Sequence, residues 1–159
     1  MADKDTYTVE RTMIVQADPA RIYQEVEDFH RWTAWSPWED LDPGMQRTYS
    51  GPEKGVGSMY AWSGNRKAGE GRMEITRVED PTRVLIDLQF IKPFKASNVI
   101  TFTFAPEGDG TRVTWTLAGP KTFAVKVMGL FTSMDKMVGK DFEKGLSRLK
   151  RVAEGAVDG

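Results

Sequence analysis

The sequence predicts an α+β fold in which one curved antiparallel sheet packs against a long C-terminal helix. Apolar and polar residues alternate with a period of two in seven segments, which is typical of half-buried strands. Near residue 130 the apolar period changes to three and four residues, which indicates an amphipathic helix. No helical pattern separates the last six strands, so their connections are expected to be antiparallel.

The N-terminal part predicts one strand followed by two short helices. Residues 7–15 alternate as a strand does, and Asp18 with Pro19 then forms a helix start, with Asp18 as the N-cap and Pro19 in the first turn. A second short helical turn runs through Trp32. It is expected to stop before Pro37, because the residue that precedes a proline avoids the helical region.

The middle of the chain predicts six strands joined by glycine- and proline-containing turns. They are expected at residues 46–50, 58–63, 71–78, 84–91, 100–104 and 113–117. With the first strand they would form a seven-stranded sheet.

The last third predicts a helix over roughly residues 133–154, with Ser133 as its cap. We expect this helix to lie across the concave face of the sheet. Its apolar face consists of Met134, Met137, Val138, Phe142, Leu146, Leu149, Val152 and Ala153.

Length and composition favour a single globular domain over residues 1–159, with its core at about residues 7–155. The 22 basic and 23 acidic residues give a net charge of −1, which argues against a nucleic-acid partner. The polar N-terminus shows no signal peptide and no run approaches 18 apolar residues, so we expect a soluble, cytoplasmic protein without integral membrane association. The oligomeric state is left open.

Composition also removes most catalytic and metal chemistries. The chain contains no cysteine, which excludes disulfides, thiolate metal sites and a thiol nucleophile. Its single histidine, His30, excludes a metal site with two histidine ligands. The acidic residues 39–42 lack the spacing of a calcium loop, and the glycines of residues 51–57 lack a phosphate-loop pattern. We therefore expect no metal and no cofactor.

Four segments resemble the START-like (SRPBCC) superfamily, specifically its polyketide cyclase/dehydrase and lipid-transport-like branch. Residues 17–23 (ADPARIY) resemble the start of that family's first helix, with isoleucine in place of valine, and residues 28–38 (DFHRWTAWSPW) resemble its second. Residues 110–115 (GTRVTW) and 140–150 (KDFEKGLSRLK) are similar to its penultimate element and its C-terminal helix. The resemblance implies a helix-grip fold with an apolar cavity between sheet and helix, but no particular ligand.

Aromatic and methionine side chains indicate where such a ligand would bind. Indoles and flexible thioethers suit an irregular apolar site, although the more common role of such residues is core and lid packing. The candidate ligand-binding residues come from the tryptophan-rich segment, the inward sheet face and the beginning of the long helix: Trp35, Trp38, Tyr60, Trp62, Met73, Phe90, Phe102, Trp115, Phe131, Met134 and Met137.

Three functions are compatible with these features. The first is binding of a small, lipid- or polyketide-like hydrophobic molecule by a carrier or sensor, which needs no catalytic group. The second is a cyclase or dehydratase, for which Glu74, Asp87, Tyr60 or His30 would have to face the cavity. Asp87 is expected instead on the outer face of the sheet, with Gln89, and His30 on the surface. The third is a protein-interaction module that resembles chaperone activators, which predicts a large exposed apolar patch.

Overall fold

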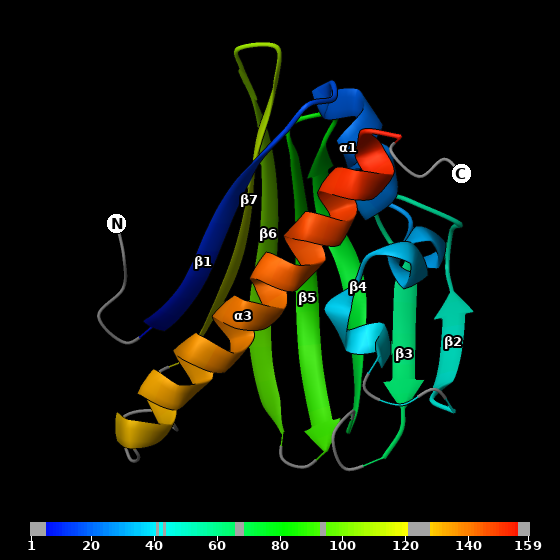
Figure 1. Cartoon of the computed structure of the whole chain (residues 1–159). Helices are drawn as coiled ribbons and strands as arrows, with labels where there is room; N and C mark the ends of the chain where they lie inside the picture. Colours follow the sequence, from blue (N-terminus) through cyan, green and yellow to red (C-terminus); the bar gives the residue numbers. More distant parts are fainter. Residues whose placement is uncertain are drawn as a thin grey trace.

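The computed structural model describes residues 6–40, 42, 44–65, 69–92, 95–120 and 128–155. The chain begins with a strand and three short helices, continues with six strands and ends with a long helix (Figure 1). The strands are β1 (Thr6–Val15), β2 (Gln46–Ser50), β3 (Met59–Ser63), β4 (Glu70–Glu79), β5 (Arg83–Lys92), β6 (Ala96–Glu107) and β7 (Gly110–Pro120). The helices are α1 (Pro19–Val26), the 3-10 helices η1 (Phe29–Ala34) and η2 (Pro37–Asp40), and α3 (Met128–Ala153).

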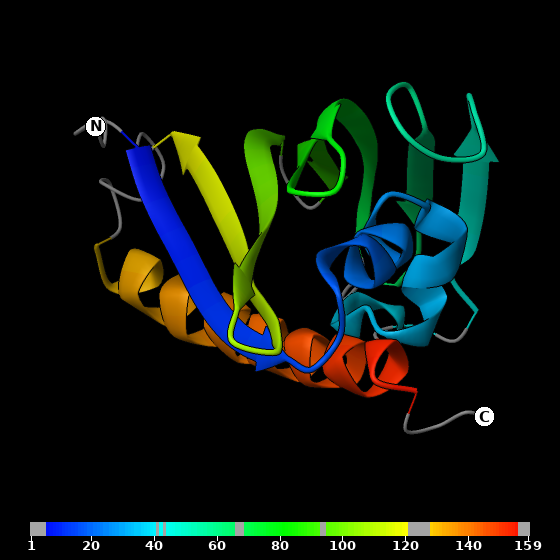
Figure 2. The same ribbon diagram turned by 90° about the horizontal axis from the view of Figure 1, so that it is seen from above.

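All seven strands form one antiparallel sheet in the order β1-β7-β6-β5-β4-β3-β2. The sheet curves around the helices, and α3 runs diagonally across its concave side (Figures 1 and 2). The C-terminal end of α3 lies beside α1, while its first turns lie near β1 (Figure 1). The α+β helix-grip architecture predicted from the sequence is confirmed.

Each strand presents one face to the helices, which we call the inner face, and one face away from them. On β5, Val84, Ile86 and Leu88 are buried on the inner face, whereas the alternate residues Asp87 and Gln89 lie on the outer face. The period-two alternation of the sequence therefore assigned the two faces correctly.

Two helix boundaries differ from the sequence prediction. The long helix begins at Met128, five residues before Ser133, because a serine inside a helix costs less than about 1 kcal/mol relative to the best helix formers. A further 3-10 helix begins at Pro37, where proline occupies a first-turn position that needs no backbone N–H donor. The helix start at Asp18 and Pro19 is as predicted, although the Asp18 side chain makes no capping hydrogen bond.

Candidate functional site

The part of the inner face that is covered by α1 and the second half of α3 is a tightly packed aromatic cluster. The Trp115 ring stacks on Phe142 of α3 at a centroid distance of 4.1 Å and on Phe102 of β6 at 4.8 Å. Both Trp115 and Phe142 have no exposed surface. Gly145 makes the close approach of α3 possible, because a Cβ atom there would lie 2.9 Å from the Trp115 ring.

The tryptophans of the short helices join this cluster. Trp35 is completely buried and contacts Trp115 edge-on at 5.6 Å, and the half-buried Trp38 does the same at 5.5 Å. Trp32 is also buried. Trp35 therefore belongs to the packed core, whereas Trp38 lies at its edge.

The inner face is less completely covered at the C-terminal ends of β3 and β5. Trp62 and Phe90 point to the inner face and are only half buried, although their strand neighbours Tyr60 and Leu88 are buried. The two rings meet edge to face at 6.0 Å. Trp62 lies over Gly71, where a Cβ atom would approach its ring to 2.6 Å. We call Trp62, Gly71 and Phe90 the aromatic ledge.

A buried polar pair lies on the same half of the inner face, across β6, β7 and β1. The Tyr7 hydroxyl donates a hydrogen bond to Asn98 Oδ1 at 2.7 Å. Both residues are buried, and burial raises the pKa of Tyr7. Gly119 leaves room for the pair, because a Cβ atom there would lie 2.0 Å from Asn98 Oδ1.

A second polar group fixes η2 to the edge strands. The Tyr60 hydroxyl donates to Glu39 Oε2 at 2.9 Å, and Arg47 Nε donates to Glu39 Oε1 at 2.5 Å. Burial, followed by the charge of Glu39, raises the pKa of Tyr60 far above its ordinary value. Tyr60 is therefore a structural hydrogen-bond donor and a poor candidate for proton transfer at neutral pH.

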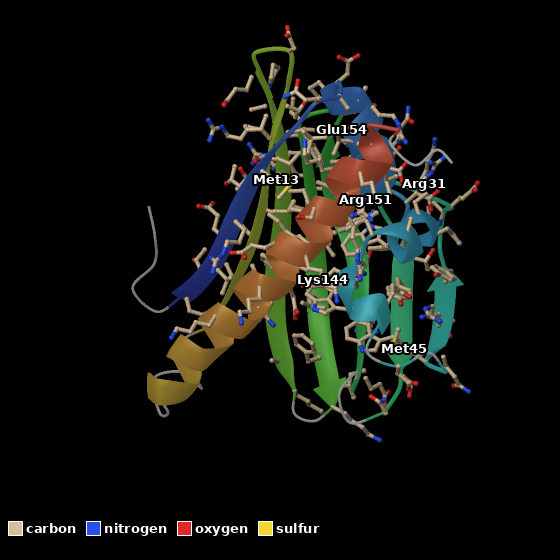
Figure 3. All side chains as sticks on the ribbon, viewed as in Figure 1. Met13, Arg31, Met45, Lys144, Arg151 and Glu154 are labelled. Atoms are coloured by element: carbon tan, nitrogen blue, oxygen red, sulfur yellow. The ribbon has the colours of Figure 1, made fainter. Side chains whose placement is uncertain are left out.

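Asp141 is the carboxyl group that sequence reasoning missed. It lies on α3 next to Phe142, in the part of the helix marked by Lys144 in Figure 3. Burial raises its pKa, and this effect outweighs the opposing hydrogen bond from the Trp38 side chain and the charge of Lys144. Only the contact with Trp38, 103 positions earlier in the chain (141 − 38), distinguishes it from the other charged residues of the helix.

The raised pKa of Asp141 predicts a pH-dependent penalty on folding. The folded chain holds this proton to a higher pH than the unfolded chain does, so stability falls as pH rises from the ordinary aspartate pKa through the raised value. Asp141→Asn should therefore be more stable than wild type at neutral pH, and this difference should vanish in acid. Urea titrations between pH 3 and pH 8, with Asp109→Asn in the exposed β6–β7 turn as the control, measure it. A difference that does not change with pH would contradict the burial of Asp141.

The structure brings most of the sequence-predicted site residues onto one surface. The sheet residues all point to the inner face, and both predicted tryptophans of the short helices pack beside them. This group comprises Trp35, Trp38, Tyr60, Trp62, Met73, Phe90, Phe102 and Trp115. Phe131, Met134 and Met137 belong to α3, but their side chains lie outside the part that the structure describes.

The carboxylates suggested for a cyclase or dehydratase do not face this surface. Glu74 and Asp87 are opposite each other in the β4–β5 register and lie on the outer face, because the alternating neighbours Met73 and Ile86 are the buried ones. Both therefore lie on the outer face, as expected for Asp87, and the condition for a catalytic role in a cavity, that the carboxylate faces inward, is not met.

His30 is an exposed residue at the start of η1, as expected. Its Nδ1 atom lies 2.9 Å from Asp28 Oδ1, and the same carboxylate oxygen accepts a hydrogen bond from the His30 backbone N–H. The imidazole stacks on Tyr49 at 4.2 Å. These contacts cap the 3-10 helix and attach it to β2, away from the Trp115 cluster.

Within the described ranges, no three or more histidine, cysteine or acidic side chains come together as a metal site would require. Likewise, none of the helices in the described ranges is long and apolar enough to cross a membrane.

The helix-grip fold with an aromatic inner face defines a class of ligand-binding and catalytic domains. The chain belongs to the polyketide cyclase/dehydrase and lipid transport family, whose model matches residues 6–154. No curated protein matches the sequence.

Solved structures share the fold at low sequence identity. Ms6760 from Mycobacterium smegmatis is 20% identical, with 99% of this chain and 97% of that chain covered and a TM-score of 0.67. SA2116 from Staphylococcus aureus, a protein of unknown function, is 10% identical, with 97% of each chain covered and a TM-score of 0.69. DynU16 from the dynemicin biosynthetic locus is 18% identical, with 97% of this chain but 49% of that chain covered and a TM-score of 0.62.

Proposed function

We propose that the protein binds a small hydrophobic molecule between the inner face of the sheet and the first half of α3, as a carrier or sensor. The observation that supports this most directly is the half-buried aromatic ledge, which continues the fully buried Trp115 cluster along the same face. A ligand on the ledge would cover the exposed parts of Trp62 and Phe90.

The size of the expected interaction is adequate for a carrier. Burial of about 500 Å² of apolar surface, summed over ligand and protein, contributes roughly 12 kcal/mol at about 25 cal/mol per Å². The loss of translational and rotational freedom offsets part of this, which leaves an affinity on the order of micromolar.

The distribution of exposed apolar residues gives less support to a protein-interaction module. Among the described residues, the exposed large apolar side chains are Val56, Ile91 and Val99. Val56 lies in the β2–β3 loop. Val99 of β6 is opposite Asp87 on the outer face, and Ile91 lies four positions after Asp87 on β5. Single exposed apolar residues of this kind are normal on a protein surface and do not form a docking patch.

Phe90→Asp should weaken the binding of apolar probes at least tenfold, because it places a charge on the ledge that a bound ligand would have to desolvate. We would titrate pyrene and a fluorescent fatty acid into the protein while following tryptophan emission. Ile91→Asp is the matched control, since it makes the same change at the next position, where the side chain is 40% exposed. Saturable binding lost in Phe90→Asp and kept in Ile91→Asp supports the proposal. Equal weakening by both variants, or no binding to wild type, would overturn it.

A further inference from the structure

Trp115 carries a buried hydrogen-bond donor that has no partner. Its Nε1 atom is the one fully buried side-chain nitrogen or oxygen without a hydrogen bond in the described part of the chain. An unpaired buried donor costs roughly 1–3 kcal/mol, and buried polar groups are paired in the great majority of cases.

The other tryptophans of the cluster show how such a donor is normally paired. Trp32 Nε1 donates to the Val26 carbonyl oxygen at 2.8 Å, and Trp35 Nε1 donates to the Glu25 carbonyl oxygen at 3.2 Å. Trp38 donates to the Asp141 carboxylate. Trp115 differs from all three, although it lies among them.

The orientation of the Trp115 ring directs this donor along the inner face. Its Cζ3 atom, on the edge of the indole opposite Nε1, is the one that approaches Gly145. Pro37 lies against the same position. The N–H group therefore lies on the edge of the ring that is turned away from Gly145 and Pro37, on the inner face on which the ligand is proposed to bind.

A second donor lies on the inner face. Asn98 is 4% exposed, and its Oδ1 atom accepts the hydrogen bond from Tyr7. Within the described ranges, its amide N–H groups have no hydrogen-bond acceptor. Two donors without acceptors thus belong to the same face, which is the arrangement that an oxygen-bearing ligand requires.

The charges of the inner face indicate that this ligand is neutral. Among the described inward-facing sheet residues the cations are Arg11 and Arg47, and each contacts a carboxylate, Glu143 and Glu39 respectively. Asp141 adds an acidic group at the edge. A ligand anion would therefore meet carboxylates without an uncompensated cation.

We infer that Trp115 Nε1–H is a specificity-determining donor that selects a neutral apolar molecule with a carbonyl-type acceptor oxygen over a plain hydrocarbon. The inference rests on the proposed function and adds to it the chemistry of the end of the ligand that would contact Trp115. A ligand carbonyl oxygen would accept the hydrogen bond that the protein leaves unmade.

A matched pair of probes tests this. 9-Fluorenone and fluorene share one ring skeleton and differ in a single carbonyl group. Equilibrium dialysis should show wild type binding fluorenone about fivefold more tightly than fluorene, the effect of one neutral hydrogen bond. Trp115→Phe, which keeps a buried aromatic ring, should bind the two probes equally. Trp32→Phe is the matched control, because its N–H is already bonded to the Val26 carbonyl oxygen, and it should keep the preference.

The outcomes separate the two proposals. If wild type binds both probes equally, or if Trp115→Phe keeps the preference, the inference is wrong while hydrophobic binding stands. If wild type binds neither probe, the inference fails, and the titrations with pyrene and the fluorescent fatty acid decide whether the proposed function fails with it. Should Trp115→Phe not fold, the infrared carbonyl stretch of fluorenone bound to wild type decides. A band lowered relative to the ketone in dry alkane supports the hydrogen bond, and an unshifted band contradicts it.

Discussion

Leu146→Ala is expected to lower the free energy of unfolding by about 2–5 kcal/mol. Leu146 lies on the buried face of α3 with no exposed surface, between Phe142 and Leu149, which are equally buried. Truncation removes apolar contacts and leaves a cavity that the surrounding rings, stacked on one another, cannot easily fill.

Urea denaturation followed by tryptophan fluorescence measures this effect. Leu85→Ala is the matched control, because Leu85 lies on the outer face of β5 and is only half buried. Leu85→Ala should lower the free energy of unfolding clearly less than Leu146→Ala does. If both variants lose the same stability, or if Leu146→Ala loses none, α3 does not anchor to the sheet as the structure describes.

Met134→Trp should reduce the binding of pyrene or a fluorescent fatty acid at least tenfold. Met134 belongs to the first half of α3, and the sequence predicts that it shares the apolar stripe of Phe142 and Leu146. An indole in place of a flexible thioether would fill the volume proposed for the ligand.

Met59→Trp is the control for this change. Met59 lies on β3 beside Tyr60, and the alternation of the strand places it on the outer face. It should leave probe binding unchanged. If Met134→Trp and wild type bind the probes equally well, the ligand site lies elsewhere in the molecule.

The strand pattern made the sheet predictable from the sequence. Period-two alternation located all seven strands and assigned the inner face, because the side-chain period in a strand is a local property of the backbone. The same rule placed Tyr60, Trp62 and Phe90 on one surface.

Three features of the site depend on contacts that local patterns do not encode. The degree of burial of Trp62 and Phe90 is set by where α3 and η2 end over the sheet. The pKa of Asp141 depends on its burial beside Trp38. The unpaired N–H of Trp115 is identified only when every neighbouring acceptor is placed. A sequence can predict that these aromatics share a face, but not which of their polar atoms lack partners.

Native mass spectrometry of the freshly purified protein tests the central claim most directly. We expect a fraction of the molecules to carry one small neutral organic molecule, released on collisional activation, and this molecule should compete with fluorenone for wild type. Protein that carries no such molecule, and that binds neither pyrene, a fluorescent fatty acid nor fluorenone at micromolar concentrations, would contradict a ligand-binding function on the inner face.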